Sequence, residues 1–235
     1  MVTVRTIISV AAAKGWILYQ MDVSNSFLQG DLYEEVYMQL PQGFHKQGKF
    51  LINDVTTILH SKFKVKDLGQ LRYFLGIEVS RSKKRILLNQ RKYALELISE
   101  ISLSGAKPVA TPIELNQKLT TVEYDTCIGK TGDSELKDNS AYQRLIGRLL
   151  TITRPDISFA VQTLSQFMQK PKKSHMEAAL RVVRYIKGAP GMELLMEAGA
   201  IDHLSAYCDS DWASCLNTRR SVTGYVVKLG NSLIS

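Results

Sequence analysis

The sequence predicts an α+β chain on three observations. Residues 140–190 carry apolar side chains at helical spacing. Residues 72–89 and 204–225 each contain two short apolar segments separated by a polar turn, which is typical of hairpins. The composition, 45% hydrophobic and 22% charged, is ordinary for a globular protein, and 235 residues suffice for one large domain or two small ones.

The first hundred residues alternate between helix and strand periodicity. In chain order the pattern predicts a helix over 2–14, strands over 16–22 and 35–39, a helix over 55–63, and strands over 72–80 and 85–89. A polar turn separates the last two strands. Asn89 is suited to cap a helix on which Tyr93, Leu97 and Ile101 recur at helical spacing.

Three helices are predicted between 140 and 190. Ser140 with Gln143, and Ser174 with Glu177, match the capping box, in which each side chain binds a backbone N–H of the first turn. Pro155 suits the first turn of the middle helix. On the third helix one face is apolar and is expected to be buried: Ala178, Ala179, Val182, Val183 and Ile186.

Charge is distributed unevenly along the chain. The net charge is +8, and residues 141–190 hold nine basic residues against Asp156 and Glu177. The candidate nucleic-acid contacts are the basic residues of this helical segment: Arg144, Arg148, Lys172, Lys173, Arg181, Arg184 and Lys187. A solvated basic surface without a partner explains the same pattern about equally well. The acidic, glycine-containing segment 113–139 is predicted to be a mobile linker.

A motif near the N-terminus carries the strongest resemblance. The segment Gln20-Met21-Asp22-Val23-Ser24-Asn25-Ser26-Phe27-Leu28-Gln29-Gly30, followed by Pro41-Gln42-Gly43-Phe44, resembles the reverse transcriptase of plant copia-type LTR retrotransposons. The resemblance implies that Asp22 is the first metal-binding aspartate of a polymerase palm. Residues 67–79, Asp-Leu-Gly-Gln-Leu-Arg-Tyr-Phe-Leu-Gly-Ile-Glu-Val, resemble the segment just downstream of that family's Tyr-x-Asp-Asp hairpin.

The Tyr-x-Asp-Asp hairpin itself is missing. No Asp-Asp dipeptide occurs in the 235 residues, and Phe44 is joined to Leu51 by a short polar bridge. We therefore expect residues 1–112 to be a partial palm with an internal deletion near 45–52. Two-metal phosphoryl transfer needs several carboxylates around the ions, so Asp22 is interpreted as vestigial. Magnesium is the cofactor of the intact family, and productive binding here is not expected.

The C-terminal part resembles a second domain of the same polyprotein. Residues 153–157 and 184–188 are similar to the connection between polymerase and RNase H, which favours nucleic acid as the partner of segment 140–190. Residues 191–235 resemble the start of an RNase H-like domain. Asp209, at the end of a predicted strand, takes the position of its first metal-binding aspartate. The later carboxylates of that domain are absent, so Asp209 is also interpreted as vestigial, although a strand-end aspartate is more often a turn former.

Other classes of protein are disfavoured. No apolar run reaches the roughly 18 residues of a membrane helix. Residues 1–15 have the pattern of a short signal or transit peptide, but the resemblance makes this segment the helix that leads into the palm strand, so an intracellular protein of unknown compartment is expected. Three cysteines without paired spacing indicate neither a disulfide framework nor a zinc site.

Three hypotheses for function remain. The chain is a catalytically inactive piece of a copia-type reverse transcriptase, a non-catalytic nucleic-acid-binding module built on the basic helices, or a gene fragment without selected function. Salt-dependent binding separates the second from the others, and cooperative unfolding separates the third.

Overall fold

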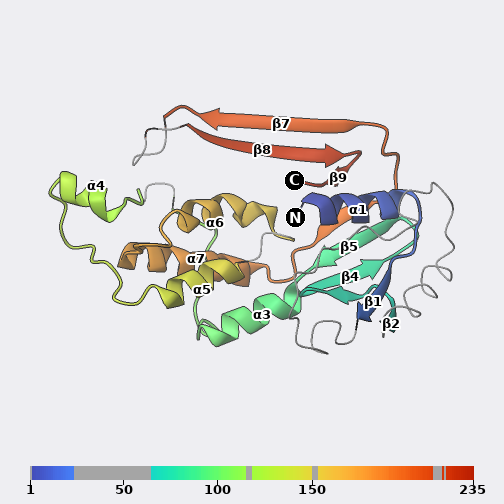
Figure 1. Cartoon of the computed structure of the whole chain (residues 1–235), viewed down its shortest axis with the longest axis horizontal. Coiled ribbons are helices and arrows are strands. Elements are labelled where there is room, and N and C mark those ends of the chain that lie inside the picture. The colour runs from blue at the N-terminus through green and yellow to red at the C-terminus, as the bar shows by residue number, and fades with distance from the viewer. Residues whose placement is uncertain (1, 24–64, 115–117, 150–152, 214–218, 220) are drawn as a thin grey trace, which may run out of the picture. The chain divides into compact units, whose positions relative to one another are not determined.

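The structure, a computed structural model, describes residues 2–23, 65–114, 118–149, 153–213, 219 and 221–235 (Figure 1). The strand predicted over 35–39, the helix predicted over 55–63 and the junction near 45–52 lie outside these residues. The chain forms two compact units. One comprises Ile17–Leu71, and the other combines Met1–Trp16 with Arg72–Ser235.

The described part of the smaller unit is a two-stranded antiparallel sheet. It pairs β1, Tyr19–Val23, with β2, Val65–Gln70. The register shifts between Tyr19 and Met21, which marks a bulge. β1 confirms the predicted strand near 16–22 with a later start, whereas the strand character of 65–70 was not predicted.

The larger unit begins with helix α1, Val2–Ala13, as the sequence predicts. Its buried residues include Ile8, Ala11 and Ala12, and it contacts β5 and β6 of a four-stranded sheet. That sheet has the order β3–β4–β5–β6 and is antiparallel throughout. Its strands are β3, Tyr73–Phe74; β4, Ile77–Arg81; β5, Arg85–Asn89; and β6, Leu194–Glu197.

The prediction of one continuous strand over 72–80 was wrong. Tyr73 pairs with Glu78 and Phe74 with Ile77, so the chain reverses at Leu75 and Gly76. Both turn residues have positive φ, 49° and 80°, which is the geometry of a tight two-residue hairpin. Apolar periodicity could not reveal this reversal because Leu75 continues the apolar pattern.

Strand β6 follows the helices in sequence and returns to pair with β5. Leu194 lies opposite Leu88, and Met196 lies opposite Ile86; all four side chains are buried. The expected boundary between residues 190 and 191 therefore falls within a continuous structural unit. The pairing is long-range, which is why local periodicity gave no indication of it.

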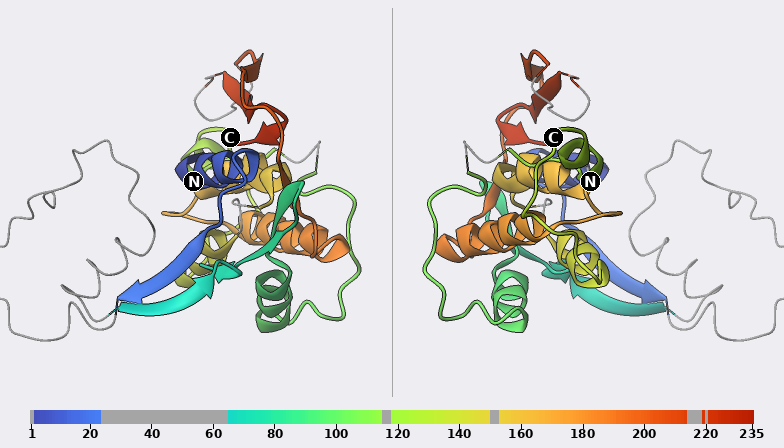
Figure 2. Two further views of the ribbon diagram at one scale, coloured as in Figure 1. Left: turned by 90° about the vertical axis from the view of Figure 1, so that its right-hand side faces the viewer. Right: turned by 90° about the vertical axis from the view of Figure 1, so that its left-hand side faces the viewer.

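The helical part is built around α7, Lys173–Gly188, which contacts α3, α5 and α6 (Figure 2). The other helices are α3, Arg91–Glu100; α4, Val122–Cys127; α5, Ser140–Arg148; the 3₁₀ turn η1, Pro155–Ile157; and α6, Ser158–Ser165. The predicted apolar face of α7 is confirmed, with all five residues buried. Tyr142 lies in this core and donates from its hydroxyl to the Leu164 carbonyl at 2.7 Å.

The chain ends in a three-stranded sheet of order β7–β8–β9, formed by Leu204–Asp211, Val222–Leu229 and Ser232–Leu233. The β7–β8 pairing confirms the predicted hairpin. Most side chains of β7 are exposed. Within the described part of the chain, no helix combines the length and apolarity that crossing a membrane requires.

Candidate functional site

Asp22 lies on β1, next to its last residue, and is exposed. Its register partner on β2 is Lys66. The small residues that follow Asp22 in the sequence lie outside the described part of the chain. A carboxylate near a strand end can contribute to a metal site, but it needs further carboxylates to hold two ions.

Asp209 is exposed on β7, opposite Gly224 of β8. Its Oδ1 accepts a hydrogen bond from the Ser210 backbone N–H at 2.9 Å. Among the residues that the structure describes, no three His, Cys, Asp or Glu side chains gather closely enough to hold a metal ion. Asp209 and Asp211 therefore lack a third acidic ligand from this part of the chain.

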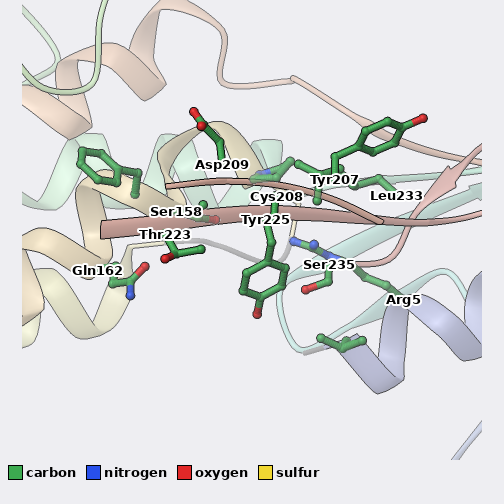
Figure 3. A pocket seen from close by; sticks show the side chains of 15 residues that line it. Arg5, Ser158, Gln162, Tyr207, Cys208, Asp209, Thr223, Tyr225, Leu233 and Ser235 are labelled. Carbon is green, nitrogen blue, oxygen red and sulfur yellow. The ribbon is translucent and has the colours of Figure 1, made fainter. Parts of the chain in front are cut away.

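A cavity of about 570 Å³ lies under the same hairpin (Figure 3). Thr223 points toward Gln162 of α6 and Tyr225 extends to the same side of the hairpin, whereas the Asp209 carboxylate points to the opposite side. Arg5 of α1 lies in the lining and is buried, and burial lowers its pKa. Asp209 is among the residues that line this cavity, but its carboxylate lies on the other side of the hairpin from Thr223 and Tyr225.

Lys172 is buried, whereas a side chain that binds a phosphate must be exposed. Its side chain is 1% exposed, and its ammonium pairs with Asp125 and, at 3.0 Å, with Asp133. It also donates to Thr120 Oγ1 at 3.2 Å, so its three protons are used. Desolvation alone lowers the pKa of Lys172, but the two aspartates outweigh it and the net shift is upward. The prediction that Lys172 contacts nucleic acid does not fit this burial.

His175 completes the same buried cluster. Its Nδ1 accepts from the Lys172 backbone N–H at 3.0 Å, and its Nε2 lies 3.1 Å from the Thr120 carbonyl. The carbonyl can only accept, so Nε2 carries the proton and the ring is neutral. Burial, helped by the Lys172 charge, lowers the pKa of His175 to about 4. Phe167 stacks on the ring with centroids 3.9 Å apart.

The acidic segment is docked on α7, contrary to the prediction of a mobile linker. Asp125, on α4, and Asp133 both bind Lys172, and Asp133 also accepts from the Ser174 hydroxyl at 2.7 Å. Glu135 forms a β-bridge with Lys172. Opposite charge holds these segments together, because buried carboxylates need cationic partners.

The outer basic residues of α7 are bound by the chain itself. Arg181 pairs with Glu114 at 2.8 Å, and Arg184 Nε donates to the Lys107 carbonyl at 2.9 Å. The Lys187 ammonium donates to three carbonyls of the loop after α3: Leu103, Ser104 and Ala106. Through these contacts the basic side chains of α7 bind residues 103–114 of the same chain.

Other basic residues of the helical segment are also paired. Arg148 pairs with Glu100, which raises the pKa of the guanidinium, and Lys170 pairs with Glu123. Arg154 is buried and pairs with Asp156 at 2.8 Å. Arg144 and Lys173 are exposed and form no ion pair with any residue that the structure describes.

Sequence reasoning missed the buried cluster of Lys172, Asp125, Asp133, His175 and Thr120. One signal could have predicted it. An acidic segment that directly precedes a basic one in sequence can fold back and neutralise it. His175 gave no such signal, because a histidine without ligand spacing is unremarkable in sequence.

Comparison with known proteins decides the family. Residues 1–51 and 47–115 match the family described as "Reverse transcriptase (RNA-dependent DNA polymerase)". The chain is 31% identical to the "Retrovirus-related Pol polyprotein from transposon RE1" of Arabidopsis thaliana, over 99% of its own length. The chain belongs to the copia-type reverse transcriptase family. The resemblance predicted from the motifs is thereby confirmed.

Two further relatives show how much of a copia-type protein is present. The chain is 27% identical over its whole length to the Pol polyprotein of transposon TNT 1-94 from Nicotiana tabacum. It is 36% identical, over 79% of its length, to 74% of an uncharacterized mitochondrial protein of Arabidopsis thaliana. The chain spans 20% of the RE1 polyprotein and 23% of the TNT 1-94 polyprotein, so it corresponds to a fragment of Pol. No solved structure matches the chain.

The alignments contain a gap. The RE1 alignment has 304 positions and the chain has 235 residues, so at least 69 positions, the difference, lack a residue of this chain. The two stretches that match the reverse transcriptase family overlap at residues 47–51, which leaves no residues of this chain between them.

Proposed function

We propose that this copia-type fragment binds nucleic acid without sequence preference and does not polymerise DNA. The observation that carries the loss of polymerisation is the overlap of the two family-matching stretches at residues 47–51. The Tyr-x-Asp-Asp hairpin of the family belongs between these stretches. The chain has no Asp-Asp dipeptide to replace it.

The metal chemistry explains why this loss is decisive. Reverse transcriptases use divalent metal ions, and a two-metal site clamps both the attacking and the leaving oxygen. Asp22 is the one carboxylate that the resemblance assigns to that site in this chain. A single carboxylate can neither neutralise nor position two divalent ions, so no productive site forms.

The fold also fits a fragment of the same polyprotein. We assign β1 with Asp22 to a remnant of the polymerase palm, segment 140–190 to the helical connection, and β7–β8 with Asp209 to an RNase H-like hairpin. Support comes from the family match over 1–115, from the strand positions of both aspartates, and from the mixture of helices and antiparallel sheets.

Primer extension tests the loss of polymerisation. The purified chain should not extend a primer on an RNA template with magnesium or manganese. Insertion of the missing Tyr-x-Asp-Asp segment from a copia-type relative at residues 47–51 is the positive control. Template-dependent extension by the unmodified chain that disappears in Asp22→Ala would overturn the proposal.

Nucleic-acid binding is supported by family membership and by a net charge of +8. Neutralising phosphates releases condensed counterions, so the affinity should fall steeply as salt rises. Fluorescence anisotropy with a labelled RNA–DNA hybrid and a duplex of unrelated sequence measures this. We expect binding at low salt, with little difference between sequences. Absence of binding at low salt would refute this part.

A further inference from the structure

We propose that the turn between β4 and β5, residues 81–85, together with the end of α1, is the surface that contacts nucleic-acid phosphates. This inference rests on the proposed nucleic-acid binding and gives it a location. The sequence pointed instead to the basic helices, whose charges the structure shows to be largely occupied.

The turn presents four basic residues in a five-residue stretch: Arg81, Lys83, Lys84 and Arg85. All four are exposed. Ser82 holds the turn in shape, because its N–H donates to the Arg85 carbonyl at 2.8 Å and its Oγ accepts from the Lys84 N–H at 3.3 Å. From Lys84 and Arg85 these bonds use backbone groups only, so they leave the ammonium groups of Lys83 and Lys84 available to a ligand.

The end of α1 extends the same surface. The Arg81 guanidinium donates to the Trp16 carbonyl, which fixes the chain just after α1 beside the turn. The exposed residues contributed here are Lys14 and Trp16; Trp16 is 58% exposed. The indole adds a flat apolar surface on which an unpaired base can stack irrespective of its identity.

Little negative charge opposes this cluster. Glu197 of β6 lies opposite Arg85 in the sheet register. Its Oε2 accepts a hydrogen bond from Asn231 at 2.9 Å, and it forms no ion pair of 4 Å or less with a described residue. The basic residues of the turn likewise form no ion pair within the described part of the chain.

The turn is a better candidate for phosphate binding than the helices, because basic residues of the helices already have partners within the chain. Lys172 is enclosed by two aspartates, and Arg181 already binds Glu114. A phosphate at either residue would have to displace a carboxylate of the same chain, whereas a phosphate at Lys83 or Lys84 displaces water and counterions. The net gain from counterion release is therefore larger at the turn.

Two matched double variants test this location. Lys83→Gln with Lys84→Gln removes two charges from the turn, and Arg144→Gln with Lys173→Gln removes two charges from exposed helix positions. Affinity for a labelled duplex is measured by anisotropy across a salt series, with circular dichroism as a check on folding. We expect the turn variant to bind roughly fivefold to tenfold more weakly, with a salt slope shallower by about 1.8, and the helix variant to bind like the unmodified chain.

Each alternative result has a distinct meaning. If the helix variant is the weaker binder, or if both weaken equally, the assignment to the turn is overturned while nucleic-acid binding stands. If the unmodified chain does not bind at low salt, the proposed function fails together with the inference. Equal affinity for anionic phospholipid vesicles and for duplex would also overturn the assignment, because the turn would then be a general anion surface.

A second readout uses the indole directly. In a Trp212→Phe background, Trp16 is the remaining tryptophan of the chain, which has two. Single-stranded DNA should quench its fluorescence, and the Lys83→Gln, Lys84→Gln variant should need more DNA for the same quenching. Binding that leaves the fluorescence unchanged would exclude the end of α1 from the surface.

Discussion

Lys172 and Asp133 lie 3.0 Å apart in a site from which water is almost excluded, on segments that the sequence separates into a basic helix and an acidic linker. Asp125 and Thr120 complete the shell around the ammonium. This buried cluster anchors the acidic segment to the first turn of α7. The cluster is sensitive to substitution, because removing one partner leaves another buried charge uncompensated.

Replacing Lys172 by Met should destabilise the protein by about 3–5 kcal/mol, because Asp125 and Asp133 would lose their cation. Urea denaturation followed by circular dichroism measures this. Lys170→Met is the control: Lys170 pairs with Glu123 on the surface, where such pairs contribute about 0–1 kcal/mol. Adding Asp125→Asn and Asp133→Asn to Lys172→Met should recover part of the loss. Equal effects of Lys170→Met and Lys172→Met would contradict the buried cluster.

Stability should fall as the pH drops from about 6.5 to about 4. The folded state lowers the pKa of His175 from 6.5 to about 4, so between these values the unfolded chain binds more protons. The loss from this group is about 3 kcal/mol. Below pH 4 the loss continues, because the folded state also lowers the pKa values of Asp125 and Asp133. For both, hydrogen bonds and the Lys172 charge outweigh desolvation.

Urea unfolding at pH 7.5, 6, 5 and 4.5 measures this dependence. His175→Gln is the control, because an amide can accept and donate in place of the ring but does not titrate. Its stability should vary less over this range, although it starts lower. An unchanged pH dependence in His175→Gln would show that other groups are responsible.

Leu75→Asn should stabilise the β3–β4 hairpin by about 0.5–1 kcal/mol. Leu75 adopts φ of 49° and is 74% exposed, whereas Asn tolerates this conformation and Asn-Gly is the preferred pair in such turns. Gly76→Ala is the opposite control, since φ is 80° and the added Cβ would lie 3.3 Å from the Tyr93 ring. Thermal unfolding should rank Leu75→Asn above the unmodified chain and Gly76→Ala below it; the reverse order would refute the turn geometry.

Changing Arg181, Arg184 and Lys187 together to Gln should lower stability more than nucleic-acid affinity. These side chains bind Glu114 and four backbone carbonyls of residues 103–107, so their loss frees that loop. We expect a loss of about 1–3 kcal/mol, since each charged hydrogen bond contributes modestly. Proteolysis should cut the loop sooner in the variant. A large loss of affinity with unchanged stability would restore the helix face as the binding surface.

Local sequence patterns predicted which segments are helical better than they predicted where each helix begins. The buried face of α7 followed directly from the spacing of Val182, Val183 and Ile186. The caps were misplaced, because Ser174 is already inside α7 and its hydroxyl binds Asp133, a residue distant in sequence. Ser140 likewise is the first residue of α5, and its N–H donates to Asp138. The Ser174 contact is long-range, so a local motif could not include it. Asp138 lies only two residues before Ser140, but the capping-box pattern does not contain it.

The family could be predicted from the sequence, whereas the partners of the charged residues could not. The motif around Asp22 identified a copia-type reverse transcriptase, because that segment is specific in residue type and order. The role of Lys172 could not be inferred from its own neighbourhood, since Asp125 and Asp133 reach it only after the chain folds back. A basic residue in a sequence therefore indicates a potential for binding, and its partner is decided by packing.

The return of β6 to β5 has a consequence for shortened versions of this protein. Without Leu194–Glu197, the backbone of β5 would be left as an open edge, and Ile86 and Leu88 would lose the cover of Leu194 and Met196. An uncovered apolar edge strand readily recruits another chain. A product that stops after α7 should therefore aggregate, so the helical segment cannot be separated at this point as a soluble module.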